Sequence, residues 1–150
     1  MKERIDYEKI LRSSPTVTIK ELKECYPVIR RLLRRLQKRL KLSDDEVYNL
    51  QLAVGEICAN AIEHGNKCAP DKSVHVSYAF HQHRLIFQVE DEGEGFNPED
   101  LPDPTKPENL LKKRGRGIFL ACSLVDEIIF QDKGRRVILV KKLTQSSSPA

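Results

Sequence analysis

Two glycine turns, separated by a polar connector, constrain this 150-residue chain more than any other feature of its sequence. The first turn, residues 91–96, follows a run of alternating apolar residues, and the second, residues 115–118, precedes an apolar segment. The connector, residues 97–114, contains four prolines and many charges, so we expect a loop there. Because glycine lets a backbone approach a ligand closely, each turn is a candidate binding element.

The segment before these turns has helical periodicity. Apolar residues from Pro27 to Leu42 recur at intervals of three and four and predict an amphipathic helix whose opposite side is basic. Ser43, with Glu46 three residues later, is typical of a capping box and predicts the start of a second helix. We expect this second helix to end near Gly65.

Strands dominate the remaining pattern. Residues 74–80 and 85–89 alternate apolar and polar side chains, and residues 127–131 and 135–142 form a second pair around an Asp-Lys-Gly turn. A short strand is also expected at residues 17–19. With a helix from residue 117 to about 125, these elements predict an α+β fold. It is a two-layer α/β sandwich with a mixed, mostly antiparallel sheet and helices on one face.

Length and composition indicate one domain. We expect an N-terminal extension at residues 1–15, containing a strand or a short helix, a folded domain at 16–143, and a disordered tail at 144–150.

No secretory signal or apolar run of membrane-spanning length occurs, so we expect a cytoplasmic protein without membrane association. The four cysteines lack Cys-x-x-Cys spacing and are expected to be buried or partly buried free thiols.

The second helix carries Glu56, Asn60 and His64 on one face, each one turn from the next. A carboxylate beside a cleft can take a proton from an attacking hydroxyl, and an amide oxygen is a ligand suited to Mg²⁺. The simpler interpretation is the solvated face of an amphipathic helix. The two glycine turns make us favour a site.

The first glycine turn begins with Asp91 and contains Gly93, Gly95 and Phe96. A buried carboxylate at a strand end can accept a hydrogen bond from an exocyclic amine. The alternative is a plain turn, since aspartate and glycine favour turns in any case.

The second glycine turn, Gly115-Arg116-Gly117-Ile118, is expected to present backbone N–H groups at a helix start, where anions bind. The helix dipole repels the cations beside it, and a bound polyphosphate would explain their presence. A solvated charge run is the alternative. The cations in question are Lys112, Lys113, Arg114 and Arg116.

Two weaker patterns favour simpler explanations. His81 and His83 could bind a metal from one strand face, but without a third ligand an exposed hairpin is the better interpretation. The basic helix side could bind nucleic acid or an anionic membrane. It has no interleaved aromatic residue and the net charge is only +4, so we favour a solvated or protein-binding face without direct nucleic-acid contact.

The three motifs, in this order, resemble the sequence boxes of the GHKL ATPases. From about residue 16 to 143 the chain is most similar to the bacterial anti-sigma factor serine kinases of that superfamily. The resemblance implies the GHKL α/β sandwich, Glu56 as general base, Asn60 as magnesium ligand, Asp91 as the adenine-binding aspartate and residues 97–114 as a lid. The implied ATP site comprises Asn60, His64, Asp91, Gly93, Gly95, Phe96, Lys113, Arg114, Gly115, Arg116, Gly117 and Ile118.

The resemblance also implies a function. It predicts an ATP- and Mg²⁺-dependent serine/threonine-protein kinase and anti-sigma regulatory factor of a partner-switching module. Such a protein phosphorylates a serine of an anti-sigma antagonist, binds a sigma factor or similar switch protein, and commonly forms a homodimer. The alternatives are a nucleotide-gated protein that sequesters its partner without phosphorylating it, and a basic helical adaptor that binds no nucleotide.

Overall fold

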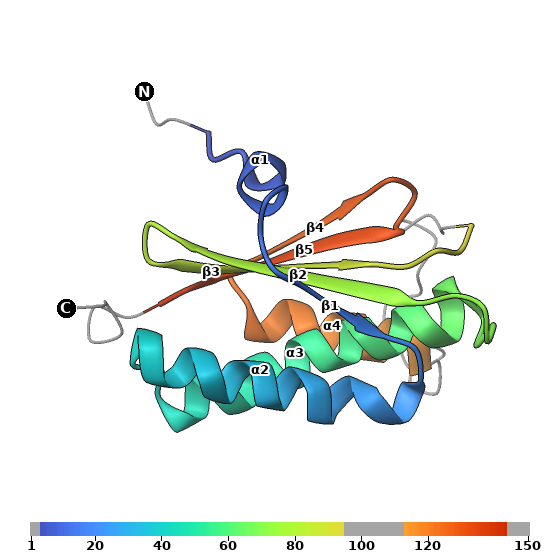
Figure 1. The fold of residues 1–150 in the computed structure, drawn as a ribbon, viewed down its shortest axis with the longest axis horizontal. Helices are drawn as coiled ribbons and strands as arrows, with labels where there is room; N and C mark the ends of the chain where they lie inside the picture. Colours follow the sequence, from blue (N-terminus) through green and yellow to red (C-terminus); the bar gives the residue numbers. More distant parts are fainter. Residues whose placement is uncertain (1–3, 95–112, 144–150) are drawn as a thin grey trace.

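The computed structural model describes residues 4–94 and 113–143, with only the backbone of residues 113–116 (Figure 1). A five-stranded sheet is covered on one face by three helices. The strands are β1 (Thr16–Ile19), β2 (Val74–His81), β3 (Arg84–Glu90), β4 (Glu127–Gln131) and β5 (Arg136–Lys142). The helices are α1 (Tyr7–Leu11), α2 (Cys25–Leu40), α3 (Asp44–Asn60) and α4 (Lys113–Leu124).

The sheet has the strand order β1-β2-β3-β5-β4, and every pairing in the described ranges is antiparallel. The α+β prediction is therefore confirmed, with an antiparallel sheet in place of the mixed one that the sequence allowed. Gln82 and His83 form the tight turn between β2 and β3, both with positive φ. Among the described residues, no group of three or more His, Cys, Asp or Glu side chains is placed to hold a metal ion.

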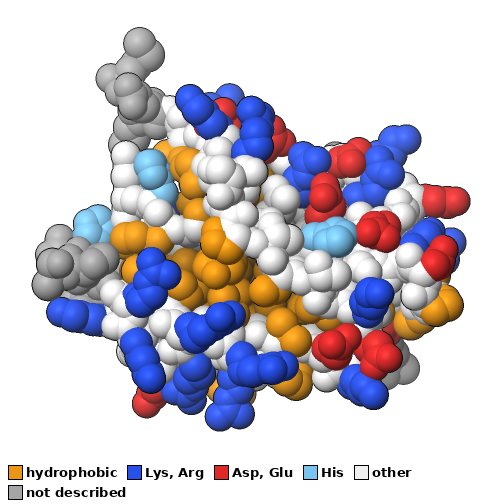
Figure 2. Space-filling view, in the orientation of Figure 1, with side chains coloured by type: hydrophobic (Ala, Val, Ile, Leu, Met, Phe, Trp, Pro, Cys, Tyr) orange, Lys and Arg blue, Asp and Glu red, His pale blue; other side chains and the backbone are white. Residues whose placement is uncertain are grey.

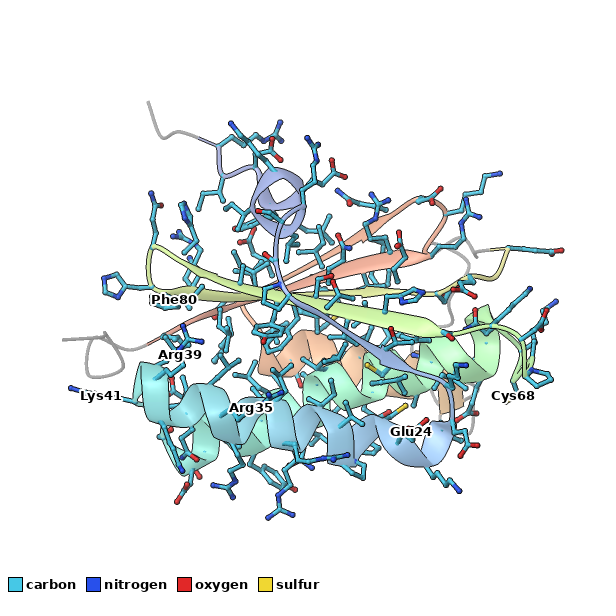
Figure 3. All side chains as sticks on the ribbon, viewed as in Figure 1. Glu24, Arg35, Arg39, Lys41, Cys68 and Phe80 are labelled. Carbon is cyan, nitrogen blue, oxygen red and sulfur yellow. The ribbon has the colours of Figure 1, made fainter. Side chains whose placement is uncertain are left out.

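The predicted helices α2 and α3 pack against the sheet as their periodicity requires. The apolar side of α2 is buried, and its arginines and lysines line the outer surface of the molecule (Figures 2 and 3). Arg35 and Arg39 are among these basic residues. The buried residues on α2 are Cys25, Ile29, Leu32, Leu33, Leu36 and Leu40. This helix therefore supplies both a large part of the core and a cationic face.

Helix α1 lies on the opposite face of the sheet from α2, α3 and α4 (Figure 1). Its residue Leu11 packs with Ile86, Ile138 and Val140 in a small second apolar cluster. The main helices thus occupy one face as predicted, and the segment left open as strand or helix is a helix. It forms because the sheet's outer face also exposes apolar side chains that need cover.

Helix α4 begins at Lys113, four residues before the predicted start, so Gly115 and Gly117 lie inside its first turns. Packing against α3 overrides the low helix propensity of these glycines.

Some of the predicted features fall outside the described residues. They are Gly95, Phe96, the predicted tail and almost all of the predicted lid. Within the described ranges, no helix combines the length and the apolar character that crossing a bilayer requires.

All four cysteines are free thiols, as expected. Cys25 and Cys58 are buried, and burial raises the pKa of the Cys25 thiol to about 12. Cys68 and Cys122 are exposed, so the expectation of burial is wrong for these two.

Candidate functional site

The C-terminal end of α3 has an unusual backbone. After Asn60 the helix widens into a π-helical turn, Ala61–Gly65, which closes with a hydrogen bond of 2.7 Å from the Asn66 N–H to the Ala61 carbonyl. Such turns are rare in proteins, and those that do occur are often found at functional sites. This turn carries His64 and brings Gly65 against the end of β3.

Asp91, the residue after β3, is only 6 % exposed. Its Oδ1 accepts a hydrogen bond of 2.8 Å from the Gly93 N–H, and its own N–H donates to the Arg135 carbonyl at 2.9 Å. Gly65 lies directly against the carboxylate, and a methyl group at position 65 would overlap it. A methyl group at position 93 would overlap the Gly65 carbonyl. The two glycines therefore permit the π-helical turn to close on the buried carboxylate.

Asn66 joins the same two segments from the other side. It is 3 % exposed, its Nδ2 donates to the Ser73 carbonyl at 3.0 Å, and its Oδ1 accepts from the Glu92 N–H at 2.8 Å. Asn66 was not among the residues predicted for the site. The available signal was an amide directly after a helix-ending glycine, a position where such side chains often bond to backbone.

Glu56 and Asn60, one turn apart on α3, lie against the first turns of α4. A Cβ atom at Gly117 would lie 2.7 Å from Oε2 of Glu56 and 3.7 Å from Nδ2 of Asn60. The other carboxylate oxygen, Oε1, accepts a hydrogen bond from the Tyr26 hydroxyl of α2. The predicted base and metal ligand thus share one place with the predicted phosphate turn.

Two spaces meet at Asn60. A pocket of about 180 Å³ is lined by Glu56, Asn60 and His64, together with Tyr26. A second space, of only about 10 Å³, lies between Asn60, Asp91 and Ile118. Asn60 lines both spaces and therefore lies between the predicted base and the predicted adenine-binding aspartate. The residues that line the space beside Asp91 leave almost no free volume in it.

The structure thus brings together residues that the sequence separates by more than 60 positions. Helix α4 begins with Lys113, Arg114, Gly115 and Arg116, whose side chains are not among those described. Tyr26, Gly65 and Asn66 join the site without having been predicted as part of it. The predicted site residues that meet here are Glu56, Asn60, His64, Asp91, Gly93, Gly117 and Ile118.

The chain matches a known protein family over most of its length. Residues 19–141 match the sequence model of the histidine kinase-like ATPase domain. The chain belongs to the histidine kinase-like ATPase family. The span that defines the family contains every site residue named above, from Tyr26 on α2 to Ile118 on α4.

Within this family the chain is similar to small serine-protein kinases, which confirms the predicted resemblance. It is 31 % identical over 125 residues to the serine-protein kinase RsbW of Bacillus licheniformis, covering 79 % of this chain and 78 % of the relative. It is 31 % identical over 123 residues to the RsbW of Bacillus subtilis (strain 168), covering 77 % of each. Among solved structures, the Acinetobacter baumannii histidine kinase AdeS aligns with a TM-score of 0.45 at 16 % identity, covering 85 % of this chain and 66 % of that one.

Proposed function

We propose that the protein is an ATP- and Mg²⁺-dependent serine/threonine-protein kinase and anti-sigma regulatory factor. It transfers phosphate to a serine of a small anti-sigma antagonist and binds a sigma factor or a similar switch protein, as a homodimer in the cytoplasm. The observation that carries this proposal is the position of Glu56. Its carboxylate lies beside Asn60 on α3 and against Gly117 of α4, where a base, a metal ligand and a phosphate-binding helix start are all needed.

The side chains present suit Mg-ATP. Asp91 offers a buried acceptor to the adenine amine, and the Asn60 amide oxygen is a hard ligand suited to a magnesium ion on the phosphates. The N-terminal N–H groups of α4 are a natural anion site. ATP supplies the phosphoryl group, and magnesium supplies the charge that stabilises it during transfer. Glu56 takes the proton of the acceptor serine.

A second function has specific support from the narrow space beside Asp91. Ligand pockets usually enclose about 300–1,000 Å³, whereas the space between Asn60, Asp91 and Ile118 is about 10 Å³. A nucleotide that binds beside Asp91 would have to widen this space, and Ile118 of α4 is part of its lining. A nucleotide that repositions α4 could control partner binding without phosphate transfer, as a nucleotide-gated sequestering protein does.

The substitution Glu56→Gln tests the kinase proposal. Glutamine keeps the shape of the side chain and can still accept the Tyr26 hydrogen bond, but it cannot take a proton. We expect the rate of phosphate transfer from labelled ATP to the co-purified antagonist to fall by about 10²–10⁴-fold. ATP affinity should stay near that of the wild-type protein, because binding requires no proton transfer.

Glu63→Gln is the matched control, because Glu63 lines the same pocket as Glu56 and lies on the π-helical turn. We expect it to transfer phosphate at nearly the wild-type rate. Normal transfer by Glu56→Gln would exclude Glu56 as the base. A wild-type protein that binds ATP and its partner but transfers no phosphate would favour the sequestering function.

A further inference from the structure

Tyr26, on α2, makes a hydrogen bond to the Glu56 carboxylate of α3. It is the second residue of α2 and is half-buried. Its ring lies over Gly55, where a Cβ atom would come within 2.6 Å of the ring carbons Cδ1 and Cε1. Its hydroxyl donates a hydrogen bond to Oε1 of Glu56. A glycine at position 55 thus provides the room that this contact needs.

The hydroxyl of Tyr26 is a stable donor in this position. Burial, and then the hydrogen bond to Glu56, raise its pKa above the ordinary value of a tyrosine. It therefore keeps its proton at any pH near neutrality. Tyr26 consequently acts on Glu56 as a hydrogen-bond donor and does not compete with it as a base.

The two carboxylate oxygens of Glu56 have different surroundings. Oε1 is held by Tyr26, whereas Oε2 points at Gly117 in the first turns of α4. An unconstrained glutamate has three flexible side-chain torsions and would sample several orientations. The bond to Tyr26 selects the orientation in which Oε2 faces the predicted phosphate-binding helix start.

We propose that Tyr26 is a positioning residue for the proposed general base: it holds Oε1 of Glu56 and so directs Oε2 toward the reacting phosphate. This inference rests on the proposed kinase function. In the step concerned, Oε2 takes the proton of the acceptor hydroxyl while that oxygen forms a bond to the γ-phosphorus. The bond between the γ-phosphorus and the β-phosphate oxygen breaks, and its electron pair leaves with ADP. Tyr26 keeps its own proton throughout.

The first test is Tyr26→Phe, which retains the ring over Gly55 and removes only the hydroxyl. With γ-labelled ATP, MgCl₂ and the co-purified antagonist, we expect the transfer rate at saturating ATP to fall about fivefold to tenfold, the effect of one hydrogen bond. The KM for ATP should stay within about twofold, because the hydroxyl serves base orientation rather than binding. Tyr48→Phe is the control, since Tyr48 lies on α3 with 65 % exposure and should be silent.

Two further variants separate positioning from a structural role. Gly55→Ala keeps both side chains but places a methyl group where the ring now lies, so we expect a loss of transfer in the same range. In a Glu56→Gln background, Tyr26→Phe should add no further loss, because no base remains to be positioned. A merely structural role would lower the rate in both backgrounds.

The outcomes distinguish this inference from the function on which it rests. No transfer by the wild-type protein overturns the kinase proposal itself. Transfer by Tyr26→Phe at the wild-type rate, in a protein that is a kinase, overturns only the positioning role. Urea unfolding of Tyr26→Phe, Glu56→Ala and the double variant tests the contact independently of activity, because Glu56→Ala removes the acceptor of the hydrogen bond. Purely additive effects of these two substitutions on the free energy of unfolding would overturn the contact.

Discussion

The two ends of α3 are held in different ways. At the N-terminus, Ser43 accepts a hydrogen bond of 3.0 Å from the Glu46 N–H, and Glu46 accepts one of 2.9 Å from the Ser43 N–H. Both partners lie within four residues. At the other end, Gly65 packs against Asp91, and Asn66 binds the backbone of Glu92. The partners there come from another part of the chain.

The charged residues at the two ends of α3 also differ in how well they match the helix dipole. The first turn contains three acidic residues, which the positive end of the helix dipole favours. The last turn contains no basic residue to match the negative end, and the buried carboxylate of Asp91 lies close beyond it. The N-terminal end is therefore arranged for helix stability, whereas the C-terminal end departs from that arrangement where the candidate site is built.

The sharpest test of this difference is Gly93→Ala. The added methyl group would overlap the Gly65 carbonyl, and backbone cannot rotate away as a side chain can. We expect the free energy of unfolding in urea to fall by about 3 kcal/mol, the upper range for an overpacked site. Glu94→Ala, one residue along and exposed, should change little. An unchanged unfolding midpoint for Gly93→Ala would refute the tight junction between the π-helical turn and β3.

A second test, Asp91→Asn, separates binding from folding at the same end. Asparagine can still accept the hydrogen bond from the Gly93 N–H, so the fold should survive. The other terminal group of asparagine is an NH₂ donor, which would face the adenine amine, also a donor. We expect this mismatch to cost at least about 2 kcal/mol of ATP affinity. Calorimetric titration of ATP measures this loss, with Glu94→Gln as control. Unchanged ATP affinity would remove Asp91 from the nucleotide site.

The smallest effect is expected at the other end, with Ser43→Ala. Loss of the capping hydroxyl should lower the free energy of unfolding by about 1 kcal/mol, and Ser43→Asp should restore most of it. ATP affinity should be unchanged, because the cap lies at the opposite end of α3 from Asn60. A clear loss of ATP affinity in Ser43→Ala would show that the two ends are not independent.

The same distinction explains which parts of the fold could be predicted. Local sequence predicts the buried stripe of α2, the capping box of α3 and the two hairpins. Each of these depends on residues that lie only two to four positions apart. Glu56, Asn60 and Asp91 could be identified as candidates because their residue types and spacing suit nucleotide chemistry. The resemblance to a kinase family connected them into one site.

Other features depend on contacts between distant parts of the chain. The start of α4 differs from the prediction because packing on α3 outweighs the poor helix propensity of Gly115 and Gly117. The position of α1 on the outer face of the sheet depends on Ile86, Ile138 and Val140, which come from β3 and β5. No local pattern contains this information.

The sequence by itself determined the secondary structure pattern, the family and the candidate chemistry of this protein. Only the tertiary structure decided that Tyr26 holds one oxygen of Glu56, and that Gly65 and Asn66 close on the segment after β3. The physical reason is distance along the chain. A helix cap or a strand alternation arises from neighbours, whereas these contacts exist only after α2, α3 and the sheet have packed into one core.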